Sequence, residues 1–380
     1  MRDTELAILS QPHSQTEKGE IDRRFHSSIG ADIPSASNLA REILTDLDTT
    51  NFGVSWWRAL PTEERILISD YLYQCTNGIE LNLAEAKLHY WEWLDAKERD
   101  NERIANAISR DDQGQIGIKL PASSAPIDDL PSKLERMHIC GFFRAIGSSL
   151  DCLGAIIIGV LGLPVSLRRS DLRKAENALA NSIVLGTQGT QIQTDFRQFF
   201  DDLKNHCGPQ DWLEWTDQYR NMFVHRGRRA SHQQIIPKEN LLFDAMGMVI
   251  PRATSIMYLA KYPDRSEVEA LIKSKNIFLN EDASITLDGI FQSCRELEEN
   301  TCNNLLNTWL LRRSDPALIE QPLSQWDVKI RNSDFVGYSP KAEDIDADVL
   351  IGNPILFRRI RAASVDDDHR GLWANSKWNQ

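Results

Sequence analysis

Apolar side chains recur at helical spacing along most of this chain. The pattern is strongest near the C-terminal end, where Leu287, Ile290 and Leu297 begin a long periodic run. Thr62 can cap a helix that Gly78 closes, because glycine readily adopts the left-handed conformation at a helix end. The pattern predicts helices over the ranges 35–47, 62–78, 83–109, 132–163, 170–185, 194–206, 209–226, 253–261 and 284–313. No convincing sheet is expected, so the predicted class is all-α.

One predicted helix is apolar around most of its circumference. Ser132 and Glu135 form a capping box at its start, and Pro164 is expected to end it. A helix without a polar face belongs in the centre of a helical core. The apolar positions that define it are Ile139, Phe142, Phe143, Ile146, Leu150, Leu153, Ile157 and Val160.

Three regions are predicted from the changes in pattern. Residues 1–33 lack a period and are expected to form a flexible arm. Residues 34–326 form the helical domain, with a core at about 130–260 and the long helix at about 284–313 packed on it. Irregular loops interrupt it at 110–131 and 228–252, and an extended tail follows at 327–380.

Composition narrows the function classes. The 380 residues carry a net charge of -12, which argues against a general nucleic-acid coat protein because an acidic surface repels phosphate backbones. The six cysteines include no pair at metal-binding or redox spacing, which indicates a reduced, cytoplasmic protein without a metal site. The most apolar run, residues 152–163, is too short to span a bilayer, so no membrane segment is expected. No cofactor motif is recognised.

The most informative stretch is the helix predicted between Asp211 and Arg229. Asn221 and His225 are four residues apart and share a face, and the long side chain of Arg220 reaches the same point. Gly227 is placed to end the helix. Its opposite face is apolar and anchors the polar residues, through Trp212, Trp215, Tyr219, Met222 and Phe223.

A guanidinium, an amide and an imidazole that converge on one point suit a phosphate diester. Arginine stabilises the extra charge of the transition state, and a histidine in the last helical turn can transfer protons near neutral pH. Between residues 218 and 238 there are five basic residues and no acid, which makes a local basic patch in an acidic chain. Arg226, Arg228 and Arg229 are expected either to contact an RNA backbone or to be solvated surface charges.

The spacing from arginine to histidine is not specific by itself. Arg226 and His232 form a second arginine–histidine pair, with five residues between them. A second His-Arg-Gly begins at His369, without an arginine upstream at the matching distance. The first match is favoured because Asn221 follows the arginine and the predicted helix carries both residues.

Arg220-Asn221-x3-His225 resembles the signature of the HEPN superfamily, whose helical domains are mostly RNase-like. The close match covers about 20 residues, within a looser helical context over about 130–260. The resemblance implies a homodimer in which two motifs form one metal-independent endoribonuclease site. Arg220 would stabilise the transition state, His225 would act as general acid and base, and Asn221 would orient the site. The RNA 2′-hydroxyl would be the nucleophile.

The resemblance also implies a toxin-like or antiviral defence setting, with an antitoxin or regulatory protein as a further partner. The alternative is a helical module of the same type that binds RNA or a partner protein without cleaving it. A plain helix end, with a surface arginine and a capping histidine, is the structural alternative for Arg220 and His225.

A polar ridge marks the otherwise apolar central helix. Arg144, Ser148 and Asp151 lie at positions i, i+4 and i+7. An internal Arg–Asp pair or a helix–helix hydrogen-bond network is the favoured interpretation. The functional alternative is that the ridge faces the Arg220 helix and orients its side chains from behind.

Overall fold

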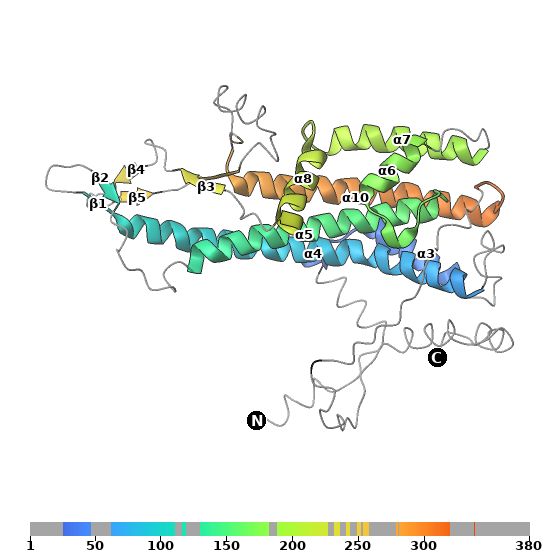
Figure 1. Ribbon diagram of the computed structural model, residues 1–380, viewed down its shortest axis with the longest axis horizontal. Helices are drawn as coiled ribbons and strands as arrows, with labels where there is room; N and C mark the ends of the chain where they lie inside the picture. Colours follow the sequence, from blue (N-terminus) through green and yellow to red (C-terminus); the bar gives the residue numbers. More distant parts are fainter. Residues whose placement is uncertain are drawn as a thin grey trace, which may run out of the picture. The chain divides into compact units, whose positions relative to one another are not determined.

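Helices dominate the part of the chain that the computed structural model describes (Figure 1). Backbone structure is described for residues 26–46, 62–110, 116–118, 130–181, 188–226, 232–235, 241–243, 249–251, 254–257, 279, 281–319 and 338. Side chains are described for residues 26–46, 68, 71–103, 130–167, 169–181, 191–221, 279, 281–319 and 338.

The helices follow the predicted order, and the all-α class is confirmed at this level. They are α3 (Pro34–Asp46), α4 (Thr62–Ala107), α5 (Leu130–Val160), the 3₁₀ turn η3 (Leu167–Arg169), α6 (Leu172–Asn181), α7 (Gln188–Cys207), α8 (Trp212–Arg226) and α10 (Ala283–Ser314).

Described strands are confined to three short antiparallel pairs, which join β1 to β2, β3 to β6 and β4 to β5. Their bounds are β1 (Ile108–Arg110), β2 (Ile116–Ile118), β3 (His232–Ile235), β4 (Leu241–Phe243), β5 (Val249–Pro251) and β6 (Thr254–Met257).

The chain divides into two compact units, each assembled from separate stretches. The first unit contains Met1–Ile33, Ile79–Leu150 and Asp202–Glu299. The second contains Pro34–Gly78, Asp151–Asp201 and Asn300–Gln380. The helical domain predicted over 34–326 includes stretches of both units.

Two predictions of local structure are wrong. Helix α4 continues through Gly78, where two helices were predicted (Figure 1). Buried Leu72, Ile79 and Leu83 continue one apolar stripe across the glycine, and this packing outweighs the cost of about 1 kcal/mol for glycine inside a helix. The second error is the helix predicted at 253–261, where β6 pairs instead with β3. The β-branched Thr254 and Ile256 suit a paired strand.

Helix α5 confirms the prediction of a buried central helix. All eight apolar positions named from the sequence are at most 5% exposed. The helix ends at Val160, before Pro164, because Gly162 adopts a left-handed conformation with φ of 60°. The backbone N–H of Leu163 then donates to the carbonyl of Ile158 at 3.0 Å, which satisfies the helix end.

Helix α5 is also long and apolar enough to cross a membrane by length and composition. Of its most apolar 18-residue window, 78% is buried inside the protein. The core helices of soluble proteins pass the same test of length and composition.

The last residues of the predicted N-terminal arm pack against the first unit. Ile29, Ala31 and Ile33 are buried. The backbone N–H of Ile33 donates to Glu80 of α4 at 2.9 Å. Residues 26–33 therefore belong to the fold of that unit.

Helix α3 is held in the second unit by the end of α10. The indole N–H of Trp309 donates to Asp46 at 2.7 Å, and Arg313 donates to Asp46 at 2.9 Å and to Glu42 at 2.7 Å. The neighbouring Arg312 is fully buried and donates to the carbonyl of Val160 at 2.6 Å. Burial lowers the pKa of Arg312 to about 9.

Candidate functional site on helix α8

A tight connection from α7 sets the start of α8. A side chain at Gly208 would come within 2.9 Å of both Trp212 and Ser293, so only glycine fits this close approach. Asp211 has a φ of 61°, a left-handed conformation that aspartate tolerates better than most residues. The indole N–H of Trp212 donates to the carbonyl of Lys204 at 3.0 Å. The direction of α8 therefore depends on contacts with α7 and α10.

The aromatic face of α8 packs into the first unit. Trp215 and Tyr219 stack with ring centroids 4.1 Å apart, and Phe143 of α5 lies 5.4 Å from Tyr219. Tyr219 is 1% exposed and Trp212 is 8% exposed. The predicted anchoring role is confirmed for these residues. Met222 and Phe223, the other predicted members, have side chains outside the described residues.

Arg220 rests directly on α5. A Cβ atom added at Gly147 would lie 2.2 Å from Cδ of Arg220 and 2.3 Å from its Nε. The stem of Arg220 therefore occupies the space that any other residue at position 147 would fill. Only 22% of the Arg220 side chain is exposed. The absence of a side chain at Gly147 thus determines where the stem of Arg220 lies on the surface of α5.

Asp217 connects Arg220 with Asn221. The amide of Asn221 donates to Oδ2 of Asp217 at 3.1 Å, and Oδ1 of Asp217 lies 3.8 Å from Nη1 of Arg220. The two contacts span one helical turn, at i,i+4 and i,i+3. The carboxylate thus faces both donors, one with each oxygen.

The predicted general acid and base lies in the last turn of α8. The helix extends to Arg226, so the backbone of His225 is helical, as predicted. The side chains of His225 and Arg226 lie outside the described residues, as do Arg228 and Arg229 entirely. The convergence of His225 with Arg220, and the role of the three arginines, remain predictions.

Within the polar ridge of α5, Arg144 makes a helix–helix hydrogen bond, as the favoured interpretation allows. Arg144 is 65% exposed and donates to Glu85 of α4 at 3.2 Å. Ser148 and Asp151 are half-buried, and Asp151 belongs to the second unit. The contact with Arg220 that is observed comes from Gly147, beside the ridge. A supporting role for the ridge residues stays a prediction.

A pair of histidines lies between α4 and α5 in the same unit. Nδ1 of His89 is 3.0 Å from Nδ1 of His138, so one ring donates and the other accepts. His138 thus has a partner on the neighbouring helix. Burial and the neighbouring His138 lower the pKa of His89, and Glu85 only partly offsets this.

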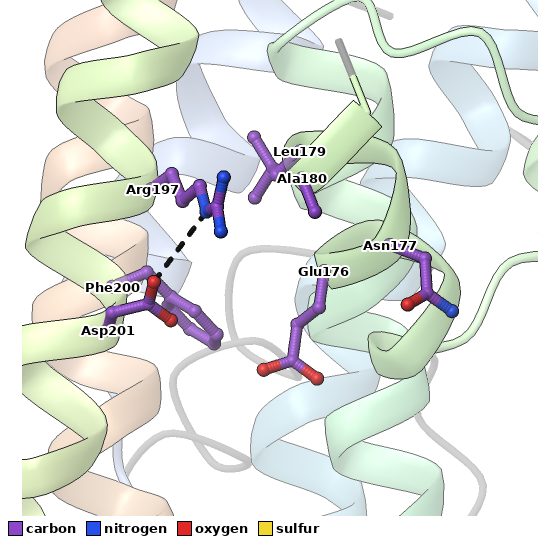
Figure 2. Close-up of a pocket in the computed structure, with 7 residues that line it drawn as sticks. All are labelled: Glu176, Asn177, Leu179, Ala180, Arg197, Phe200 and Asp201. Atoms are coloured by element: carbon purple, nitrogen blue, oxygen red, sulfur yellow. Dashed lines mark ion pairs between the residues drawn. The ribbon is translucent and has the colours of Figure 1, made fainter. Parts of the chain in front are cut away.

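The second unit contains a pocket of about 270 Å³ between α6 and α7. Figure 2 shows Arg197 directed toward Leu179 and Ala180, with Glu176 on the α6 side. Arg197 lies 3.7 Å from Asp201, its partner on α7. Two acids and one base line this pocket, so it offers no concentrated charge for binding phosphate.

No family model, curated protein or solved structure matches this chain. Among the described residues, no three histidine, cysteine, aspartate or glutamate side chains are grouped to hold a metal ion.

Sequence reasoning missed two residues of the candidate site, Asp217 and Gly147. Asp217 could have been found, because it precedes Arg220 and Asn221 by one helical turn. Gly147 carried a weaker signal, since a glycine within an apolar helix often marks close packing without identifying the neighbour.

Proposed function

We propose that this protein is a metal-independent endoribonuclease of the HEPN type. The observation that carries the proposal is the arrangement of Arg220 and Asn221 on α8. Arg220 is seated on Gly147, Asn221 is bonded to Asp217, and His225 follows in the last turn of the same helix. A fixed guanidinium with a helix-borne histidine suits charge stabilisation and proton transfer at a phosphodiester.

In the proposed reaction, His225 takes the proton from the RNA 2′-hydroxyl, and the resulting oxygen attacks the adjacent phosphorus. Arg220 stabilises the extra negative charge on the phosphoryl oxygens, and Asn221 orients the site. The bond to the 5′-oxygen breaks, and that oxygen takes up a proton from a histidine of the composite site. The products are a 2′,3′-cyclic phosphate and a 5′-hydroxyl.

The resemblance to the HEPN superfamily adds a homodimer to the proposal, with the α8 motifs of two copies forming one site. An antitoxin or regulatory protein, a defence setting and a cytoplasmic location belong to the same proposal. The aromatic packing of α8 supports it, because a rigidly anchored helix can present identical side chains to a second copy.

The direct test is RNA cleavage by the purified full chain in the presence of EDTA. Arg220→Ala should lower the rate by about 10²–10³-fold, as for loss of a group that stabilises transition-state charge. His225→Ala should lower it by about 10²–10⁴-fold. The products should carry 2′,3′-cyclic phosphate and 5′-hydroxyl ends, and the rate per protomer should fall on dilution if two copies form the site.

Helix α7 provides matched controls for both substitutions. Arg197 also has an ion-paired aspartate on its own helix, and His206 also lies in the last turn of its helix. Arg197→Ala and His206→Ala should leave cleavage unchanged. Equal cleavage by wild-type, Arg220→Ala and His225→Ala proteins would refute the proposed endoribonuclease activity of this site. RNA binding without cleavage by the wild-type protein would instead favour the non-catalytic module.

A further inference from the structure

Asp217 of α8 lies one helical turn before the Arg220-Asn221-x3-His225 motif. Asp217 is 37% exposed, and its two oxygens face different partners, Asn221 at 3.1 Å and Arg220 at 3.8 Å. Adjacent residues on a helix point about 100° apart, so Arg220 and Asn221 do not converge through the backbone alone. The carboxylate of Asp217, one turn earlier, accepts a hydrogen bond from Asn221 and lies at ion-pair distance from Arg220, and so draws both side chains toward one point.

We propose that Asp217 is a positioning residue that sets the direction of Arg220 and Asn221 for RNA cleavage. The assignment to RNA rests on the function proposed above. With Gly147 against its stem and Asp217 beside its guanidinium, Arg220 is held at two points from two helices. Asp217 itself transfers no proton and contacts no reacting atom. The site motif therefore becomes Asp217-x2-Arg220-Asn221-x3-His225.

An acid beside a phosphate-binding arginine has a second physical consequence, because it repels the RNA backbone. Positioning of Arg220 and repulsion of RNA by Asp217 have opposite effects on the rate of cleavage. If positioning dominates, removal of the charge slows cleavage of bound RNA. If repulsion dominates, removal of the charge tightens RNA binding and speeds cleavage. The observed contacts favour positioning, since Asp217 lies 3.8 Å from Arg220 and accepts a hydrogen bond from Asn221 at 3.1 Å.

The experiment compares Asp217→Asn, Asp217→Glu and Asp217→Asn/Arg220→Ala with wild-type protein. Single-turnover cleavage at saturating RNA is measured beside the Kd for a 2′-O-methyl RNA that cannot be cleaved. Asp217→Asn should slow single-turnover cleavage by up to about 10²-fold, as for a misplacement of about 1 Å, with little change in Kd. Asp217→Glu keeps the charge and should restore part of the rate. In the Arg220→Ala background, Asp217→Asn should have no further effect.

Asp201→Asn is the matched control, because Asp201 pairs with Arg197 at 3.7 Å on another helix surface (Figure 2). This variant should cleave as wild type does. Unchanged or faster cleavage by Asp217→Asn, together with tighter RNA binding, would overturn the positioning role while the enzyme proposal stands.

A second measurement follows the Nε–H signal of Arg220 by NMR in the absence of RNA. An ordered, protected signal in wild-type protein should broaden or exchange faster in Asp217→Asn, and remain unchanged in Asp201→Asn. If the wild-type protein does not cleave RNA, the proposed function fails, whereas this signal still decides whether Asp217 orders Arg220. An equally ordered signal in Asp217→Asn would overturn the positioning role by itself.

Discussion

Gly147→Ala adds one methyl group at the contact between α5 and Arg220. The new Cβ would lie 2.2 Å from Cδ of Arg220, roughly 1.3 Å closer than the ~3.5 Å of an ordinary carbon–carbon contact. Since Gly147 lies inside α5, its helical backbone accepts alanine, and the obstacle is the arginine stem. The substitution therefore displaces Arg220 with little direct effect on its charge.

The expected stability change combines two opposing effects. Overpacking costs about 1–3 kcal/mol, whereas replacement of glycine by alanine within a helix contributes about 1 kcal/mol of stabilisation. Gly147→Ala should therefore lower the free energy of unfolding by up to about 2 kcal/mol. When Arg220→Ala has already removed the stem, the same substitution should raise it by up to about 1 kcal/mol. The coupling between the two sites should be about 1–3 kcal/mol.

Urea denaturation of the wild-type, single-variant and double-variant proteins measures this coupling, and RNA cleavage measures its functional effect. Gly147→Ala should lose about 10²-fold in cleavage if Arg220 moves by about 1 Å. Gly141→Ala is a matched control on the same helix as Gly147, because its Cβ would lie 2.4 Å from the ring of His89 of α4. Gly141→Ala should retain cleavage. An equal effect of Gly147→Ala on stability with and without Arg220 would refute the seating of the arginine on this glycine.

Two further predictions concern the stability of the first unit. Asp282 caps α10 by accepting from the Ser284 N–H at 2.8 Å, and it pairs with Lys97, whose side chain is 12% exposed. Asp282→Ala should lower the free energy of unfolding by about 2–4 kcal/mol. Asp282→Asn retains a cap and should lower it by about 1 kcal/mol less. Equal losses for the two variants in urea denaturation would contradict the capping role. The pKa of His89 is lowered in the folded protein by burial and by His138, so the unfolded chain binds the proton more tightly. The free energy of unfolding should thus fall as pH drops below about 6.5, and His89→Gln should flatten this dependence; an unchanged slope in the variant would contradict it.

The helices that carry the candidate site are determined largely by local sequence. Helical periodicity identified α5 as the buried central helix and placed Asn221 and His225 on one face of α8, with Arg220 one step round the helix, because a repeat of 3.6 residues fixes which side chains share a face. The same rule would have placed Asp217 beside them, since it lies one turn earlier.

Longer-range packing decided the remaining features. Gly78 could end a helix or continue it, and the apolar stripe on either side decided for continuation. Thr254 and Ile256 form a strand because β3 supplies the partner. The seat of Arg220 on Gly147 joins residues 73 positions apart, and no local pattern specifies such a contact. The sequence thus determined which side chains α8 presents, whereas the packing of α8 on α5 determined where its arginine is held.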